Sequence, residues 1–347
     1  MIIVDQMRDM LMRGLNSKLG REVQSQSMDF IYNNQKQLMW GFGALFGFIA
    51  LITSPIWITM AVLSSPFIIA GVLLFMYTDT FNPIIKFLIR QFFELYTSNY
   101  QKNDLTFLNG GYADSEIENG VFLKTYKDKF DVLRIQLYNY IVMRFGEVNS
   151  MNGLNLLETG CGRGGGLHYL AREMNPQSAL GIDIARSQIE YCKKHWMGDK
   201  LNLNFIQHDV ENLESIISRN TIDYAIDIES SMFYPNKSRF FREISKALRR
   251  DGVFLFGTMM SSIQMKSMET KLCQYFEIVK SEDITREVVQ SLKLSTKSYS
   301  DLVENNFPRW THWLLKQAYG IEGTYIHRLM ENRTFVYKIY QCKRKTQ

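Results

Sequence analysis

The chain has 347 residues, a length typical of about two domains. Its net charge of +5, from 40 Lys and Arg against 35 Asp and Glu, lacks the concentrated basic surface that a nucleic-acid-binding protein needs. The 4 cysteines lie far apart without a CxxC pair, which argues against a disulfide scaffold and a zinc ribbon. We therefore expect no metal and no nucleic-acid partner.

The N-terminal region has the most uneven composition. No charged residue occurs in the 42 positions from Gln37 to Thr78. A bilayer core about 30 Å thick needs about 20 helical residues per crossing, so this run fits two crossings better than one. Pro55 and Pro66 offer breaks, because proline disfavours helix at the residue before it. The sequence predicts a transmembrane helical hairpin over residues 38–78, with a buried soluble helix pair as the alternative.

The charges beside this run predict its orientation. Lys and Arg occur on both flanks, which places both, and everything C-terminal, on the cytoplasmic or matrix side. Residues 1–37 show amphipathic spacing. Residues 79–104 are expected to form an interfacial amphipathic helix and linker on the lipid bilayer, with an ordinary core-facing helix as the alternative. No feature separates the endoplasmic reticulum from the mitochondrial inner membrane.

From about residue 105 onward, short apolar segments alternate with helical patterns. This alternation predicts an α/β fold with a Rossmann-like, doubly wound parallel sheet over residues 105–347. The late segments Phe276–Lys280 and Thr334–Lys343 predict an antiparallel pair at the sheet edge. The five earlier predicted strands are Leu154–Glu158, Ala179–Asp183, a segment around Leu201–Phe205, Ile222–Ile228 and Val253–Phe256.

A glycine-rich turn follows the first of these strands and opens a helix. Gly160, Gly162 and Gly164 allow a tight turn and let a ligand approach the backbone. Asp183 ends the next strand, where a carboxylate can accept hydrogen bonds from ribose hydroxyls. Asp209 follows the third strand, where it can accept from an adenine amino group. The G-x-G-x-G spacing differs from the NAD fingerprint, and no Walker pattern for ATP is present.

Several motifs together carry a family resemblance: ETGCGRGGG, GID, QHD, IDIESSMFYPN and ALRRDG. In this order and spacing they resemble class I S-adenosylmethionine-dependent methyltransferases. They are most similar to the branch that methylates phthiotriolones, sterols and tocopherols. The resemblance covers roughly residues 105–347 and implies S-adenosylmethionine as cofactor. It also implies that Glu158 and the three glycines surround the methionine half, Asp183 the ribose, and Asp209 with the backbone near His208 the adenine.

The acceptor side departs from this pattern. Where the branch commonly has E-x-S-H after the fourth strand, this chain has Glu229-Ser230-Ser231-Met232, so methionine replaces the histidine. Glu229, Tyr234 and Asp227 are the remaining catalytic candidates, because methyl transfer to a hydroxyl needs a group that removes a proton. Asp227 and Tyr234 could equally be structural.

Two functions follow from these features. The first is a membrane-anchored methyltransferase that acts on a lipophilic acceptor, such as a sterol, a prenylated phenol or another lipid. The second is a structural subunit that keeps the fold without catalysis inside a membrane complex, for example a respiratory one, with other subunits as partners. The missing histidine and the hairpin favour the second, whereas the intact cofactor motifs favour the first. The sequence identifies neither the acceptor nor the oligomeric state.

Overall fold

The computed structural model describes residues 82–99, 106–114, 131–197 and 201–345. The amphipathic segment 1–37 and the hairpin 38–78 lie outside these residues and stay predictions. Within the described ranges, no helix combines the length and the apolar character needed to cross a bilayer.

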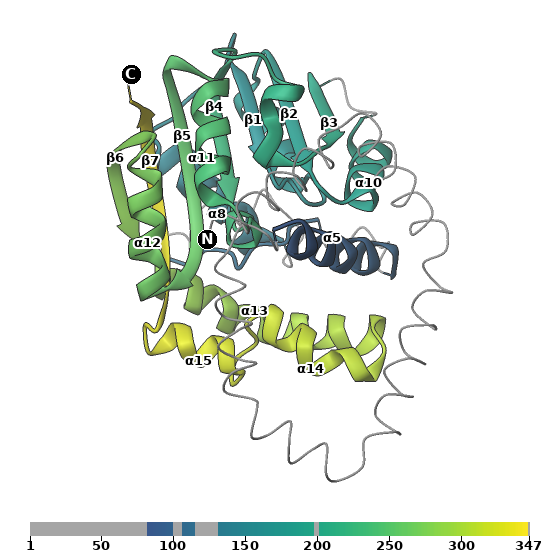
Figure 1. Cartoon of the computed structure of the whole chain (residues 1–347). Helices are drawn as coiled ribbons and strands as arrows, with labels where there is room; N and C mark the ends of the chain where they lie inside the picture. Colours follow the sequence, from purple (N-terminus) through teal and green to yellow (C-terminus); the bar gives the residue numbers. More distant parts are fainter. Residues whose placement is uncertain (1–81, 100–105, 115–130, 198–200, 346–347) are drawn as a thin grey trace, which may run out of the picture. The chain divides into compact units, whose positions relative to one another are not determined.

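A seven-stranded sheet forms the centre of the fold, in the order β3-β2-β1-β4-β5-β7-β6 (Figure 1). The first five strands are parallel, and β7 lies antiparallel between β5 and β6. This arrangement confirms the predicted doubly wound sheet with an antiparallel last strand. The strands are β1 (Asn155–Thr159), β2 (Ser178–Asp183), β3 (Leu203–Gln207), β4 (Ile222–Ile228), β5 (Leu248–Ser261), β6 (Phe276–Asp283) and β7 (Phe335–Arg344).

The antiparallel pair predicted at the sheet edge is confirmed, because β6 pairs antiparallel with β7 and lies outermost. β7 itself pairs on both sides, and Tyr337, Ile339 and Tyr340 are fully buried. β5 is longer than its apolar run, since its pairing with β7 continues from Val253 to Ser261. Ladder hydrogen bonds to a neighbouring strand can extend a strand through residues whose own pattern is weak.

Helices cover both faces of the sheet. One core packs side chains of α8, α9, α10, α13 and α15, and the other those of η3, α11 and α12. A 3-10 turn, η4 (Ser231–Phe233), follows β4. The other bounds are α8 (Val132–Asn139), continued by the π-helical turn η2 (Tyr140–Phe145), α9 (Gly165–Met174), α10 (Arg186–Trp196), η3 (Val210–Ser215), α11 (Lys237–Ala247), α12 (Ser262–Leu272), α13 (Thr285–Asn306) and α15 (Tyr325–Glu331).

The helix α5 (Asn82–Asn99) falls within the segment expected to lie on the bilayer. One of its faces is instead buried against the sheet domain, where Tyr96 packs with Leu302 and Val303 of α13 and Leu315 of α14 (Arg309–Ala318). Figure 1 shows α5 and α14 below the sheet in the view. Another face of α5 leaves Ile84 and Leu88 exposed. The helix is therefore core-facing on one side, as the alternative predicted, and its placement on a bilayer stays a prediction.

Candidate functional site

The turns that follow β1 to β4 surround the larger of two cavities, which has a volume of about 200 Å³. Ligands of parallel α/β sheets bind at this carboxyl edge of the strands. Seven of the predicted site residues line it, and α5 and α14 close it from the other side. Those seven residues are Gly160, Gly162, Asp183, His208, Asp209, Glu229 and Tyr234.

The glycines of the turn have two different roles. Gly162 has a φ of +51°, and a Cβ at this position would come within 3.3 Å of Leu108 in the cavity wall. Gly164 has a φ of +74°, and a Cβ there would come within 2.7 Å of the Phe205 ring. Gly162 therefore keeps the backbone open toward the cavity, whereas Gly164 allows α9 to begin close against β3.

Asp183 is held at the end of β2 by backbone donors. The N–H of Gly162 donates to its Oδ2 at 3.0 Å, and that of Ala185 donates to its Oδ1 at 2.8 Å. Burial raises the pKa of this carboxyl to about 6, while the backbone donors lower it. The carboxylate is thus fixed at the cavity wall, where its remaining lone pairs can accept hydrogen bonds from ribose hydroxyls.

Asp209 is also oriented by its own backbone, because its side chain accepts from the N–H of Glu211 at 2.9 Å and caps η3. Lys86 of α5 places its Nζ 2.6 Å from Asp209 Oδ2 and 2.6 Å from Glu211 Oε2. This contact was not predicted, since Lys86 lies in the segment 79–104 that was expected on the bilayer. Spacing carries no signal for a contact between residues so far apart in the sequence.

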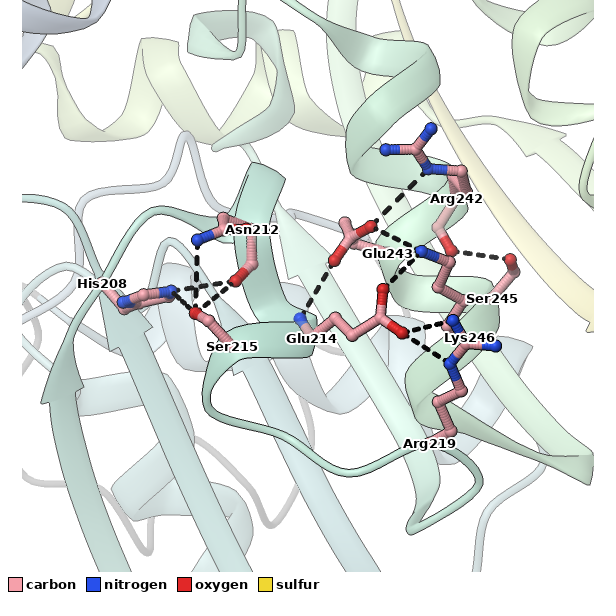
Figure 2. A network of polar contacts seen from close by, with 9 residues as sticks. All are labelled: His208, Asn212, Glu214, Ser215, Arg219, Arg242, Glu243, Ser245 and Lys246. Carbon is pink, nitrogen blue, oxygen red and sulfur yellow. Dashed lines mark hydrogen bonds and ion pairs between the residues drawn. The ribbon is translucent and has the colours of Figure 1, made fainter. Parts of the chain in front are cut away.

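Figure 2 shows how η3 is attached to the helix α11 beside it. Glu243 accepts from the backbone N–H of Glu214 at 3.0 Å, and Lys246 bridges the carboxylates of both residues. His208 turns its ring to the Asn212 carbonyl and the Ser215 hydroxyl. These contacts fix the segment that carries Asp209. The His208 ring makes its hydrogen bonds within this segment.

Two predicted site carboxyls lie behind the cavity wall. The Tyr138 hydroxyl donates to Glu158 at 2.5 Å, and burial raises the Glu158 pKa to about 8. Asp227 is fully buried and accepts hydrogen bonds from Thr159, Ser230 and Ser231. Neither residue lines this cavity or the smaller one beside it. Their positions favour organising the turns around Gly160 over contact with an acceptor.

Tyr234 and Glu229 reach the cavity from the segment after β4. The Tyr234 hydroxyl donates to Ser230 at 2.8 Å. Glu229 has a φ of +59°, a left-handed conformation that is uncommon for a residue with a side chain. Gly110 donates its N–H to Glu229 Oε1 at 2.8 Å, and burial raises the Glu229 pKa to about 7. A carboxyl with this pKa exchanges a proton readily near neutral pH.

Met232 occupies the position of the branch's histidine but packs with the core residues around α11. It is absent from the lining of both cavities. The structure thus leaves Glu229 as the carboxylate that faces the open space after β4.

The chain is similar to known methyltransferases. A model of the methyltransferase domain family matches residues 150–319. The phthiotriol/phenolphthiotriol dimycocerosates methyltransferase of Mycobacterium tuberculosis is 26% identical over 252 residues, covering 72% of this chain and 90% of that protein. A fatty-acid O-methyltransferase of Mycolicibacterium smegmatis is 28% identical over 246 residues, covering 70% and 85%.

A solved structure shows the same fold. The cyclopropane synthase MmaA2 of Mycobacterium tuberculosis superposes with a TM-score of 0.55 at 13% identity, covering 72% of this chain and 98% of that one. This likeness shows the fold, and the family model with the curated relatives confirms the predicted enzyme class and cofactor. The chain carries a class I methyltransferase domain, homologous to mycobacterial lipid methyltransferases, and is an S-adenosylmethionine-dependent methyltransferase.

Proposed function

We propose that the protein methylates a lipophilic acceptor that enters the active site from a membrane surface. The observation that carries this proposal is the wall of the larger cavity opposite the glycine turn. It consists of apolar and aromatic side chains, mostly from α5 and α14. These are Ile89, Phe92, Phe93, Phe233, Leu315 and Ala318.

The outer surfaces of the same two helices support entry from a bilayer. Trp310 and Trp313 of α14 are 81% and 71% exposed, and Leu88 of α5 is 60% exposed. Tryptophan is enriched where proteins meet the bilayer surface. The charge-free run predicted to span the membrane ends at Thr78, just before α5 begins at Asn82. An integral-membrane protein with its catalytic domain on the cytoplasmic or matrix side fits these features.

The residues around the cavity suit the cofactor and the reaction. S-adenosylmethionine supplies a methyl group bonded to a positively charged sulfur. Asp183 would hold the ribose and Asp209 the adenine, and Gly162 leaves its backbone accessible between them. Glu229 lies on the acceptor side, where its carboxylate can take a proton. The aromatic wall excludes water and aligns the acceptor, which is most of what a methyl transfer requires of the protein.

Labelled S-adenosylmethionine tests this proposal with the full chain reconstituted in phospholipid vesicles. We expect label in sterol, prenylated-phenol or fatty-alcohol acceptors dissolved in the bilayer, and none in short water-soluble analogues. Trp310→Ser with Trp313→Ser should lower turnover of bilayer-dissolved acceptors while sparing acceptors presented in detergent micelles.

Ile263→Ser is the matched control, because Ile263 on α12 is also 81% exposed but lies away from the cavity. Methylation of the soluble analogues alone would contradict the proposal.

A further inference from the structure

A second, smaller cavity adjoins the first. The two share Leu108, Asn109, Glu229, Ala318 and Tyr319 in their walls. The volume of the second is about 60 Å³, less than a third of that of the first. A lipid chain does not fit in this space, whereas a small terminal group does.

Apolar side chains of α13 and α15 form much of the second cavity, namely Val288, Leu292, Ile326 and Met330. Its polar side chains are those of Asn109, Glu229, Tyr299, Tyr319 and Tyr337, and none of its lining residues is Lys, Arg or His. Three of them have other partners: Tyr299 accepts from Arg134 Nε at 2.8 Å, Tyr319 bonds to the Tyr96 hydroxyl, and Asn109 binds backbone atoms.

The Tyr337 hydroxyl differs from its neighbours. Tyr337 is fully buried, and its hydroxyl faces the Glu229 carboxylate. It lies near enough to the Glu229 carboxylate to lower the pKa of that group. The backbone of Tyr337 is fixed on β7 by Thr285 and Ile284, so the ring is held in place. A tyrosine hydroxyl both donates and accepts, so in this cavity wall it can turn its proton to an oxygen that enters beside Glu229.

Glu229 faces the same space in a strained conformation. Left-handed backbone at a residue with a side chain costs of order 1–3 kcal/mol and tends to occur at functional sites. One carboxylate oxygen is tied to the Gly110 N–H. The charge of buried Arg134 favours the ionised carboxylate, and Arg134 is itself paired with Asp131 at 3.6 Å.

We propose that the second cavity binds the reacting group of the acceptor and that this group is a neutral hydroxyl. When the acceptor enters between them, the Tyr337 hydroxyl donates to the acceptor oxygen, and the acceptor hydroxyl donates to the Glu229 carboxylate. The inference rests on the proposed function, because it specifies the acceptor of that same site. The body of the lipid then extends into the larger cavity.

The step balances with these two residues. The acceptor oxygen forms a bond to the methyl carbon while its own O–H bond breaks and the proton passes to Glu229. The carbon–sulfur bond breaks, and its electron pair stays on sulfur as a neutral thioether. Tyr337 keeps its proton and stabilises the negative charge that develops on the acceptor oxygen. Glu229 then releases the proton to solvent.

A carboxylic acid acceptor fits this cavity poorly. It is ionised at neutral pH, has no proton for Glu229 to accept, and would place its negative charge beside a second carboxylate. A carboxylate-binding site would need a cationic side chain in the lining, which the second cavity lacks. The geometry therefore selects between hydroxyl and carboxyl acceptors of equal chain length.

The test uses the full chain in vesicles with octadecanol and octadecanoic acid as a matched pair of probes. We expect methylation of the alcohol and not of the acid. Glu229→Gln should lower kcat by about 10²–10⁴-fold, the usual contribution of a general base. Tyr337→Phe should lower it by about 10–100-fold, the loss of one hydrogen bond to a charged group. Both variants should bind S-adenosylmethionine as the wild type does.

Tyr340→Phe is the control on the same strand, since its hydroxyl contacts Glu269 within the opposite core. Turnover should also rise with pH through about 7 in the wild type and lose this dependence in Glu229→Gln. Methylation of the acid alone would overturn the inference and leave the proposed function standing. Equal turnover numbers for Tyr337→Phe and Tyr340→Phe would do the same. Methylation of neither probe would overturn both.

Discussion

Glu94 of α5 connects this helix to the domain through the start of α10. Its Oε1 accepts from the N–H of Arg186 at 2.7 Å, and its Oε2 accepts from that of Ser187 at 2.9 Å. The residue before α10 is Ala185, whose side chain cannot accept a hydrogen bond. Glu94 of α5 therefore caps the N-terminus of α10 in its place. Only 4% of Glu94 is exposed. We predict that Glu94→Ala measurably destabilises the domain.

The size of the effect follows from the groups left unpaired. Replacing a capping side chain with alanine costs about 0.5–2 kcal/mol, and a charged acceptor near a helix N-terminus adds about 0.3–1 kcal/mol. Glu94 is buried and holds two N–H groups, so we expect the upper end, about 2–3 kcal/mol. For a domain of this size that loss corresponds to roughly 4–12 °C in Tm.

Thermal unfolding of the full chain in detergent, followed by circular dichroism, measures this shift. Glu190→Ala is the matched control, because Glu190 pairs with Arg186 of the same helix but is 56% exposed. Exposed pairs of this kind contribute only about 0.3–0.5 kcal/mol. Equal Tm values for the two variants would refute the assignment of Glu94 as the cap of α10.

Three further predictions concern the cofactor side. Asp183→Asn should weaken S-adenosylmethionine binding by about 10–100-fold in calorimetry, since a hydrogen bond to a charged group contributes about 1.5–3 kcal/mol; unchanged affinity would contradict the ribose assignment. Gly162→Ala should cost about 1–2 kcal/mol in unfolding free energy at its φ of +51°, and a variant as stable as wild type would count against this strain. The Glu158 pKa of about 8 lies above its ordinary value of 4.5, so the folded state favours the protonated carboxyl. The contribution of this proton to the unfolding free energy is fully present below pH 4.5 and is lost as pH rises through 8. In the absence of cofactor, Glu158→Gln should remove this decrease in unfolding free energy between pH 5 and 8. The same pH dependence of stability in the wild type and in Glu158→Gln would contradict the prediction.

The strands of the parallel sheet were predictable because each is a short apolar run bounded by turns. β4 was predicted with its observed ends, Ile222 and Ile228. The cofactor turn was predictable as well, since its glycines and acids occur at fixed distances from strand ends. The placement of β7 inside the sheet was not predictable, because strand order depends on pairing between distant segments, which leaves no periodic trace in the sequence.

The sequence by itself predicted the class of enzyme and the cofactor, through the family resemblance that its glycine turn and strand-end acids carry. It also indicated Glu229 as a catalytic candidate, because Met232 occupies the position where the related branch has a histidine. Only the tertiary structure brought Lys86 to Asp209, Glu94 to the start of α10, and Tyr337 beside Glu229. Each of these contacts joins segments about 90 or more positions apart. Long-range packing selects such partners by shape and charge in three dimensions, so spacing along the chain does not encode them.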